Sequence, residues 1–358
     1  MISYDGKEVC RVVKNVSIVS LSSGLAGEEF EKFALDIGLK RLKDYGLNVK
    51  FMPNALKGIE YLNAHPEKRA EDLVQAFKDP DTDMILCAIG GDDTYRLLPY
   101  LFDSDELKNA VSEKIFLGFS DTTINHFMLH KLGLPTFYGQ AFLTDICEMS
   151  SEMLPYTRKY FEELIRTGTI SEITPSDVWY EERTAFDESQ VGVPLKEHKC
   201  KGFELLQGSP VFSGKILGGC ICSMYDMFDS ERYPDMPVLC RKYGLFPDRE
   251  EWKGRILLLE SSEEKPSPEK YRRALEYLRD EGVFEAVSGV LLGKPMDETY
   301  SEEYKKLLVS VIDRPELPIV YDLNIGHANP RCIMPFGREA VVDAEKQSIC
   351  FSDRKHTK

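Results

Sequence analysis

The sequence has no excess of positive charge and no long apolar run. Its 45 Lys and Arg residues are outnumbered by 60 Asp and Glu residues, which gives a formal net charge of −15. This balance argues against nucleic acid or an anionic membrane as a partner, because both are bound by clustered Lys and Arg. No apolar run approaches the length of a membrane span. Residues 1–7 lack the apolar core of a signal peptide, so we expect a cytoplasmic protein.

Paired cysteine motifs are missing as well. The chain contains nine cysteines, an odd number, and none of them forms a C-x-x-C motif. We therefore expect reduced thiols rather than a disulfide framework or a zinc knuckle. His126 and His130 lie four residues apart, but Phe127 stands where a zinc-protease motif has its glutamate. We expect neither a bound metal nor a cofactor.

The 358 residues, 42% of them hydrophobic, are enough for a large core and for two domains. In the first part of the chain, short apolar runs alternate with segments of helical periodicity. Such alternation predicts an α/β fold in which helices cover both faces of a parallel sheet. In sheets of this kind, sites form at the carboxyl ends of the strands. The expected strands are 16–21, 47–51, 84–89 and 115–117, and the expected helices are 28–45 and 65–77.

The pattern breaks in the middle of the chain and then resumes. Residues 166–213 are polar and β-prone and lack clean helical periodicity, which indicates a connector. We therefore expect a parallel-sheet domain at 1–165, a connector at 166–213 and a second α/β domain at 214–358. The second domain has expected strands at 214–219, 255–259, 287–292 and 319–321, helices at 268–279 and 302–312, and a hairpin of 340–342 with 348–351.

The most informative segment is Gly118-Phe119-Ser120-Asp121-Thr122-Thr123. It follows an expected strand and precedes an expected helix, which is the setting in which α/β enzymes expose a nucleophilic serine on an elbow. The glycine permits a sharp turn, and the helix N-terminus supplies N–H groups for a developing oxyanion. A plainer interpretation is that Ser120 or Asp121 only caps the helix, since both residue types are good N-caps.

A serine nucleophile needs a base and a third group that orients the base. His327 is the best placed of six histidines, because it follows an expected strand and precedes the turn sequence Ala328-Asn329-Pro330. Glu260 comes directly after four aliphatic residues, where a carboxylate is costly to bury unless it is paired. The plainer alternatives are a surface histidine and a glutamate that steps into solvent. The order Ser120, Glu260, His327 is that of the α/β-hydrolases, although Thr122 replaces the second glycine of their G-x-S-x-G motif.

Five blocks that span most of the chain carry a more specific signal. They are Gly90 to Pro99, Gly118 to Thr123, Gly214 to Gly219, Ile256 to Glu260, and Gly326 to Pro330. Together, and in this order, they resemble the LD-carboxypeptidase family of serine peptidases, which includes the microcin C immunity proteins.

The resemblance implies a triad with Ser120 as nucleophile, His327 as general base and Glu260 as the residue that orients His327. It implies an oxyanion hole formed by the backbone N–H groups of Gly91 and Asp121. It further implies two domains with a cleft between them, a homodimer and no metal. Family members hydrolyse an amide at the C-terminal end of a small peptide. The bond leads to a terminal D-alanine in muropeptides, during peptidoglycan recycling, or to a modified nucleotide in the immunity branch.

Two further features bear on the substrate. Asp92 and Asp93 follow Gly90-Gly91, where the family often has an aromatic or small residue, and we expect these carboxylates to affect which substrate charge is accepted. Trp179 resembles a connector tryptophan of the immunity branch, and stacking of its ring on a nucleobase would contribute about 1–3 kcal/mol. Ordinary packing of the connector explains Trp179 equally well.

Two other functions fit parts of the sequence. Gly90-Gly91-Asp92-Asp93 also resembles the phosphate loop of phosphofructokinases and NAD kinases, in which backbone amides approach a nucleotide phosphate. A nucleotide-dependent small-molecule kinase is therefore an alternative, but it leaves Glu260 and His327 without a role. A non-catalytic binding protein is a third possibility, which the presence of all three triad residues weakens.

Overall fold

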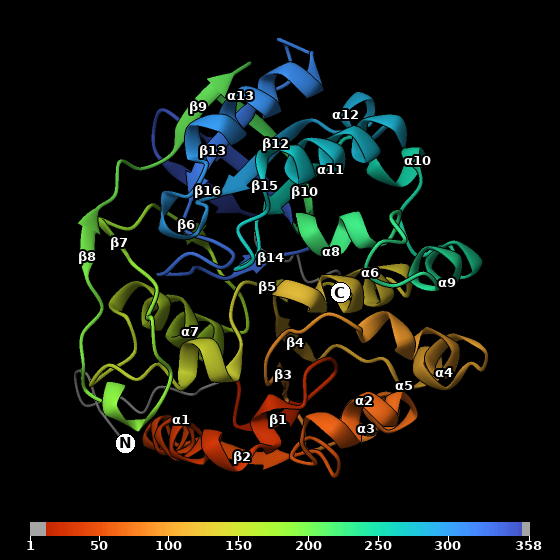
Figure 1. The fold of residues 1–358 in the computed structure, drawn as a ribbon, viewed down its shortest axis with the longest axis vertical. Coiled ribbons are helices and arrows are strands. Elements are labelled where there is room, and N and C mark those ends of the chain that lie inside the picture. The colour runs from red at the N-terminus through yellow and green to blue at the C-terminus, as the bar shows by residue number, and fades with distance from the viewer. Residues whose placement is uncertain (1–11, 353–358) are drawn as a thin grey trace.

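The chain builds two main sheets, which lie in the lower and upper halves of the view in Figure 1. The computed structural model describes residues 12–352, so the outermost residues of both expected domains, 1–11 and 353–358, lie outside the description. The α/β class expected from the sequence is confirmed, with a parallel sheet in the first part of the chain and a second sheet in the rest.

The first sheet is parallel except for one edge strand, β14, which comes from near the end of the chain. β3 and β4 are buried throughout, as strands covered on both faces must be, and this explains their continuous apolar sequences. In spatial order the strands are β14 (Met334–Pro335), β5 (Phe137–Tyr138), β4 (Ile115–Gly118), β3 (Met84–Cys87), β1 (Asn15–Val19) and β2 (Asn48–Phe51).

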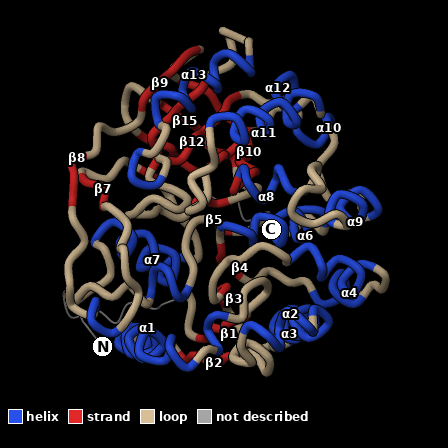
Figure 2. The backbone as a smooth tube through the Cα atoms, viewed as in Figure 1, coloured by secondary structure: helices blue, strands red, loops and turns tan. Residues whose placement is uncertain are grey.

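Helices flank this sheet on two sides, with α1 and α7 on one side of the strands and α2 to α5 on the other in Figure 2. α1 begins four residues later than the sequence predicts, because residues 25–27 and 29–31 form short 3-10 turns. The helices are α1 (Lys32–Asp44), α2 (Ile59–Ala64), α3 (Pro66–Lys78), α4 (Leu98–Phe102), α5 (Glu106–Ala110), α6 (Thr123–Lys131) and α7 (Pro155–Thr167).

The second sheet has a parallel centre, β10 to β13, with antiparallel strands on both sides. Its spatial order is β6 (Glu172–Ile173), β16 (Ser348–Phe351), β15 (Glu339–Asp343), β10 (Val211–Cys220), β11 (Ile256–Glu260), β12 (Gly289–Gly293), β13 (Ile319–Leu323) and β9 (Glu204–Gln207). The expected connector supplies β6 and β9, and it also forms a separate pair, β7 (Val178–Tyr180) with β8 (Glu197–Lys199). The domain boundaries at 165 and 213 stay a prediction.

The two longest helices of the second half of the chain, the part that carries most of the second sheet, bury one face each. In α11, Tyr271, Ala274, Leu275 and Leu278 recur at three- and four-residue spacing and are all buried, which accounts for the helical periodicity of this segment. The helices are α8 (Ile221–Asp226), α9 (Met236–Lys242), α10 (Arg249–Trp252), α11 (Pro268–Asp280), α12 (Val283–Ala286) and α13 (Ser301–Ile312). No described helix is both long enough and apolar enough to cross a bilayer.

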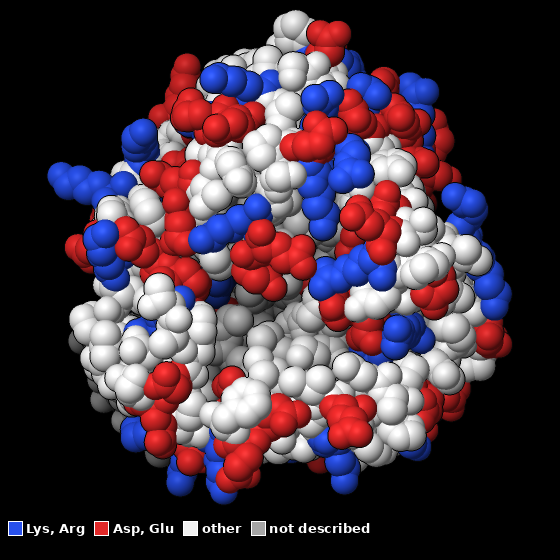
Figure 3. Space-filling model, viewed as in Figure 1, with Lys and Arg blue, Asp and Glu red and all other residues white. Residues whose placement is uncertain are grey.

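The carboxyl ends of three strands position the predicted triad. Ser120 follows β4 of the first sheet, Glu260 ends β11 of the second sheet, and His327 lies on the loop after β13. In the space-filling view the surface is hollowed between the two halves, and acidic and basic side chains mingle along the upper rim of the hollow (Figure 3). The strand ends of both sheets therefore meet at one place.

Candidate active site

Ser120 lies at the sharp turn between β4 and α6. It begins a single 3-10 turn, Ser120–Thr122, and its φ of 65° is in the left-handed region that residues other than glycine rarely adopt. A Cβ on Gly90 would stand 2.7 Å from the Cβ of Ser120, so only glycine fits there. The Ser120 N–H donates a hydrogen bond to the Tyr138 hydroxyl at 3.1 Å. A strained strand-to-helix turn of this kind is typical of a serine nucleophile.

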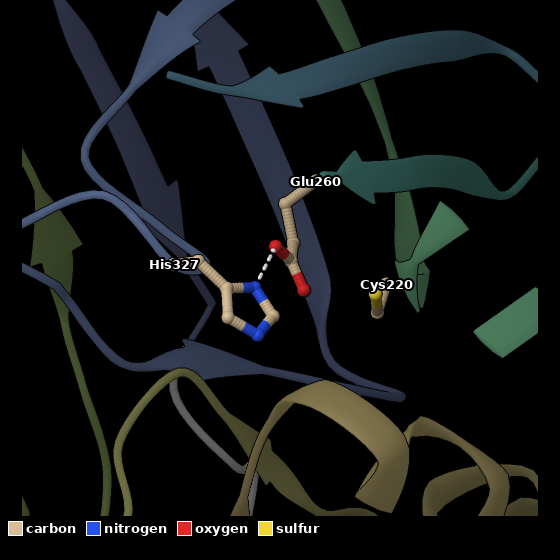
Figure 4. A group of neighbouring side chains, drawn as sticks. All are labelled: Cys220, Glu260 and His327. Atoms are coloured by element: carbon tan, nitrogen blue, oxygen red, sulfur yellow. Dashed lines mark hydrogen bonds and ion pairs between the residues drawn. The ribbon is translucent and has the colours of Figure 1, made fainter. Parts of the chain in front are cut away.

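The structure brings Ser120, His327 and Glu260 together from distant parts of the sequence. His327 Nε2 is 2.9 Å from Ser120 Oγ, and His327 Nδ1 is 2.7 Å from Glu260 Oε2. Figure 4 shows the imidazole and the carboxylate facing each other. All three side chains belong to buried residues. The hydroxyl, imidazole and carboxylate thus form one chain of contacts, in the arrangement that nucleophilic catalysis by serine uses.

Glu260 is held in place by Tyr138 and by the close approach of Gly326. The Tyr138 hydroxyl donates to Glu260 Oε1 at 2.6 Å, while the other carboxylate oxygen faces His327. Gly326 has a φ of 90°, and a Cβ there would lie 2.5 Å from Glu260 Oε2. Tyr138 therefore contacts both Glu260 and the backbone of Ser120.

Arg331 fixes the loop that carries His327. Its guanidinium donates to the carbonyl of His327 at 2.8 Å and to that of Gly326. It also forms a buried ion pair with Asp145 at 2.9 Å and lies 4.9 Å from the centre of the Phe119 ring. The loop is thus tied to the first half of the chain by charge, which limits how far His327 can move relative to Ser120.

A second carboxylate also reaches His327. Glu263 Oε2 is 2.9 Å from His327 Nε2, the nitrogen that also contacts Ser120. Burial favours the neutral imidazole, but the charge and hydrogen bond of Glu260, followed by those of Glu263, outweigh it and raise the pKa of His327 to about 10. For Glu263, partial burial is outweighed by the hydrogen bond and charge of His327, which lower its pKa to about 2.

The two backbone groups expected in an oxyanion hole lie on adjacent loops. Gly91 has a φ of 147°, and among residues 12–352 its N–H has no hydrogen-bond acceptor. The Asp121 carboxylate accepts hydrogen bonds from Ser22 Oγ at 2.6 Å and from the Thr94 N–H at 2.9 Å. Burial raises the pKa of Asp121 to about 7, although these hydrogen bonds oppose the rise. The side chain of Asp121 therefore joins the serine turn to the loop of Gly91.

Asp92 and Asp93 have different surroundings. Asp93 is 5% exposed and forms a buried ion pair with Arg69, whose Nη1 is 2.5 Å from its carboxylate. Asp92 is more exposed and pairs with Arg232 of the second half at 2.7 Å. The structure thus gives Asp93 a partner inside the protein, and it places Asp92 in an ion pair between the two halves. Contact of either residue with substrate stays a prediction.

Trp179 is packed between neighbours. Its ring stacks on His198 with 4.4 Å between centroids, the Lys294 ammonium lies 5.6 Å from the ring centre, and the residue is 6% exposed. The next residue, Tyr180, donates its N–H to the Asn329 carbonyl at 2.9 Å, so the connector is joined to the loop of His327. In this arrangement a nucleobase could stack on Trp179 only if His198 or Lys294 moved.

The side chains that could hold a metal are poorly suited to do so. Cys220 offers its sulfur within 4.8 Å of ligand atoms of Glu260 and His327 (Figure 4). A hydrogen bond with Cys222, followed by burial, raises the pKa of the Cys220 thiol well above its usual value, whereas metals bind the thiolate. Both ring nitrogens of His126 are already engaged, by Thr136 and by a backbone carbonyl.

A cavity of about 370 Å³ adjoins the loops of the site. Ile89, which precedes Gly90, lines it from the first half, and Asn329 and Arg331, which follow His327, line it as well. The remaining wall is largely apolar. It consists of Leu25, Glu31, Phe33, Ala34, Leu143, Thr144, Cys147, Glu148, Met149, Glu182, Arg183 and Phe186.

Sequence reasoning missed Tyr138, Arg331 and Glu263. Tyr138 lies on a two-residue strand that is too short to show a period. Arg331 directly follows the Gly326 to Pro330 block, and Glu263 lies three residues beyond Glu260, so their closeness to predicted site residues was the only available signal.

Comparison with known proteins identifies the family of this chain. Residues 16–139 match the model of the LD-carboxypeptidase N-terminal domain, and residues 213–342 match that of the LD-carboxypeptidase C-terminal domain. The chain belongs to the LD-carboxypeptidase family. It is accordingly a serine peptidase, and the family resemblance seen in the sequence is confirmed.

Relatives in this family carry two kinds of name. A solved structure of an MccF-like protein from Streptococcus pneumoniae, in complex with AMP, is 59% identical, covers 96% of this chain and 100% of its own, and has a TM-score of 0.95. The microcin C7 self-immunity protein MccF of Escherichia coli is 26% identical over 302 residues, 82% of this chain and 80% of that protein. A probable murein peptide carboxypeptidase of Bacillus subtilis is 27% identical over 323 residues, 88% and 86% of the two chains.

Proposed function

We propose that this LD-carboxypeptidase family member hydrolyses the amide between the C-terminal acyl group of a small peptide or amino acid and a nucleotide. The observation that carries the chemistry is the contact chain from Ser120 through His327 to Glu260. The nucleotide is favoured over a muropeptide by the 59% identical relative, whose structure holds AMP.

In the proposed reaction, His327 Nε2 takes the proton of Ser120 Oγ as the oxygen attacks the substrate carbonyl carbon. Glu260 stabilises the imidazolium that forms. The N–H groups of Gly91 and Asp121 stabilise the negative charge on the carbonyl oxygen. The C–N bond then breaks as His327 returns the proton to the leaving nitrogen, and water hydrolyses the acyl-Ser120 ester by the same steps.

The test compares two substrates by mass spectrometry of the products. The wild-type protein and Ser120→Ala are each incubated with an amino acid amide-linked to an adenylate analogue and with a muropeptide that ends in D-alanine. We expect the wild type alone to release the nucleotide. Release of D-alanine alone would assign the muropeptide activity instead, and an ATP-dependent mass gain on a sugar or dinucleotide would point to the kinase alternative.

Two other properties belong to the same proposal. We propose that the protein acts in the cytoplasm and as a homodimer, as the family resemblance implies. Light scattering coupled to size-exclusion chromatography tests the second point, because a mass near the 40.9 kDa of one chain would contradict it.

A further inference from the structure

Glu263 reaches the reacting nitrogen of the site from the surface. Its side chain is 61% exposed, whereas that of His327 is 7% exposed, yet its carboxylate lies 2.9 Å from His327 Nε2. Ser120 Oγ lies at the same distance from the same nitrogen. Both groups are therefore within contact distance of the nitrogen, Ser120 with hydrogen-bond geometry and Glu263 as an ion-pair partner.

The contact of Glu263 with His327 favours a proton on His327 Nε2. A ring nitrogen that faces a carboxylate holds its proton, and an imidazolium cannot accept the proton of Ser120. The other groups that face His327 do not supply a base. Glu260, at the end of β11, already accepts from Nδ1, Cys220 at the end of β10 keeps its proton, and Arg331 contacts only the carbonyl of His327.

Glu263 is free to leave this contact. Among the described residues, its carboxylate has no ion-pair partner besides His327. The adjacent Glu264, in contrast, is bound by Arg232 at 3.1 Å and by Lys270 at 3.6 Å. Glu263 is thus an exposed carboxylate whose ion-pair partner is the general base of the proposed reaction, and its own backbone N–H and the charge of Arg232 also act on it.

We propose that Glu263 is a specificity-determining residue, which blocks His327 in the free protein and moves to the α-ammonium group of an aminoacyl substrate. This inference rests on the proposed function and specifies its substrate class as an aminoacyl conjugate with a free amine. When a carbonyl carbon lies about 3–3.5 Å from Ser120 Oγ, the α-ammonium, one carbon away, comes close to the carboxylate of Glu263. The ammonium then pairs with the Glu263 carboxylate, and His327 releases its proton to solvent and becomes a base.

The first experiment needs no substrate. A fluorophosphonate probe without an amine labels an activated serine, and its rate of reaction with Ser120 is measured from pH 5 to 10 in the wild type, Glu263→Gln and the control Glu264→Gln. The labelling rate should rise with pH as His327 loses its proton. We expect this rise to occur at least one pH unit lower in Glu263→Gln than in the wild type, which makes labelling near pH 7 about tenfold faster. Glu264→Gln should follow the wild type. The same pH dependence of the labelling rate in all three proteins would overturn the inference.

The second experiment measures kcat/KM for an aminoacyl adenylate analogue and for its N-acetyl derivative. The wild type should prefer the free amine, and the preference should largely vanish in both Glu263→Gln and Glu263→Ala, whose folding is checked by circular dichroism. A wild-type preference that survives both substitutions, or no preference at all, would contradict the role of Glu263.

The two proposals fail in different ways. If Ser120 reacts with the probe and the wild type cleaves the conjugate, but the Glu263 variants behave like the wild type, only the role of Glu263 is wrong. If neither labelling nor cleavage occurs in any protein, the proposed function is wrong, and the proposed role of Glu263 is wrong as well.

Discussion

His327 titrates against two carboxylates, and its charge has opposite effects on stability and activity. Its pKa of about 10 lies above the ordinary value of 6.5, so the charged form stabilises the fold fully below pH 6.5, and this contribution is lost as the pH rises through 10. Catalysis needs the neutral form. Alkaline conditions should therefore activate the site of the free protein and weaken the fold around it.

The triad residues should act as a unit. Ser120→Ala, His327→Ala and Glu260→Ala should each lower kcat by about 10⁴-fold or more, and combining them should add little, because each variant already disables the same contact chain. Steady-state kinetics of single and double variants test this, with Glu264→Gln as the control. Modest losses that multiply in the double variants would show that the residues do not cooperate.

Asp121 should make the protein less stable as the pH rises. Its folded-state pKa of about 7 lies above the ordinary value of 3.8, so stability is fully present below pH 3.8 and is lost as the pH rises through 7. Asp121→Asn removes this titration. Urea unfolding between pH 4 and 8 should therefore show a flatter pH dependence for the variant than for the wild type, and parallel curves would contradict the assignment.

At the scale of elements, the loop after β3 and the turn after β4 leave no space for added atoms. A Cβ on Gly91 would stand 2.3 Å from Ser22 Oγ and 2.7 Å from the Ser23 nitrogen. Ser22 in turn donates to Asp121, so a shift of one loop shifts the other. The two N–H groups of the proposed oxyanion hole are thus positioned by the same packing.

Gly91→Ala should lower kcat by about 10²- to 10³-fold, the usual effect of losing one oxyanion donor. Gly133→Ala is a matched control, because Gly133 also has a positive φ, of 79°, but has nothing within 4 Å of the added Cβ. The control should lose stability through backbone strain and keep its turnover. Equal kcat values for the two variants would remove Gly91 from the site.

The elements that the sequence predicts well are those whose own residues determine them. The apolar runs of β3 and β11 and the spacing in α11 are local patterns, and so is the turn that carries Ser120. β5 and β14 are two residues long, and they exist only because their partner strands are in place. The contacts of Tyr138 and Glu263 depend on how two sheets meet, which no local pattern encodes.

At the scale of the whole molecule, contacts join the two halves of the chain, which lie on either side of the hollow in Figure 3. β14, from the second half of the chain, pairs with β5 of the first sheet. The Tyr138 hydroxyl binds Glu260, and the Arg331–Asp145 ion pair is buried between the loop of His327 and the first half. These links make the distances of the triad a property of both halves together.

Equilibrium unfolding should therefore occur in a single transition. Trp179 and Trp252 both lie beyond residue 165, so fluorescence reports on the connector and the second half, whereas far-UV circular dichroism reports on both halves. The two signals should coincide as a function of urea concentration. A circular dichroism transition that is displaced from the fluorescence transition would show that the halves unfold independently.

β14 lies much later in the sequence than the other strands of its sheet, and this has a consequence for folding during synthesis on the ribosome. Until Met334–Pro335 emerges, β5 is the open edge of the first sheet, and an open edge can pair with other chains. About 200 residues separate the two strands, so at about 5–20 residues per second the edge stays uncovered for about 10–40 s. The nascent protein must pass this interval before Ser120, His327 and Glu260 can take up the arrangement seen here, so the proposed site cannot assemble until the residues up to β14 have left the ribosome.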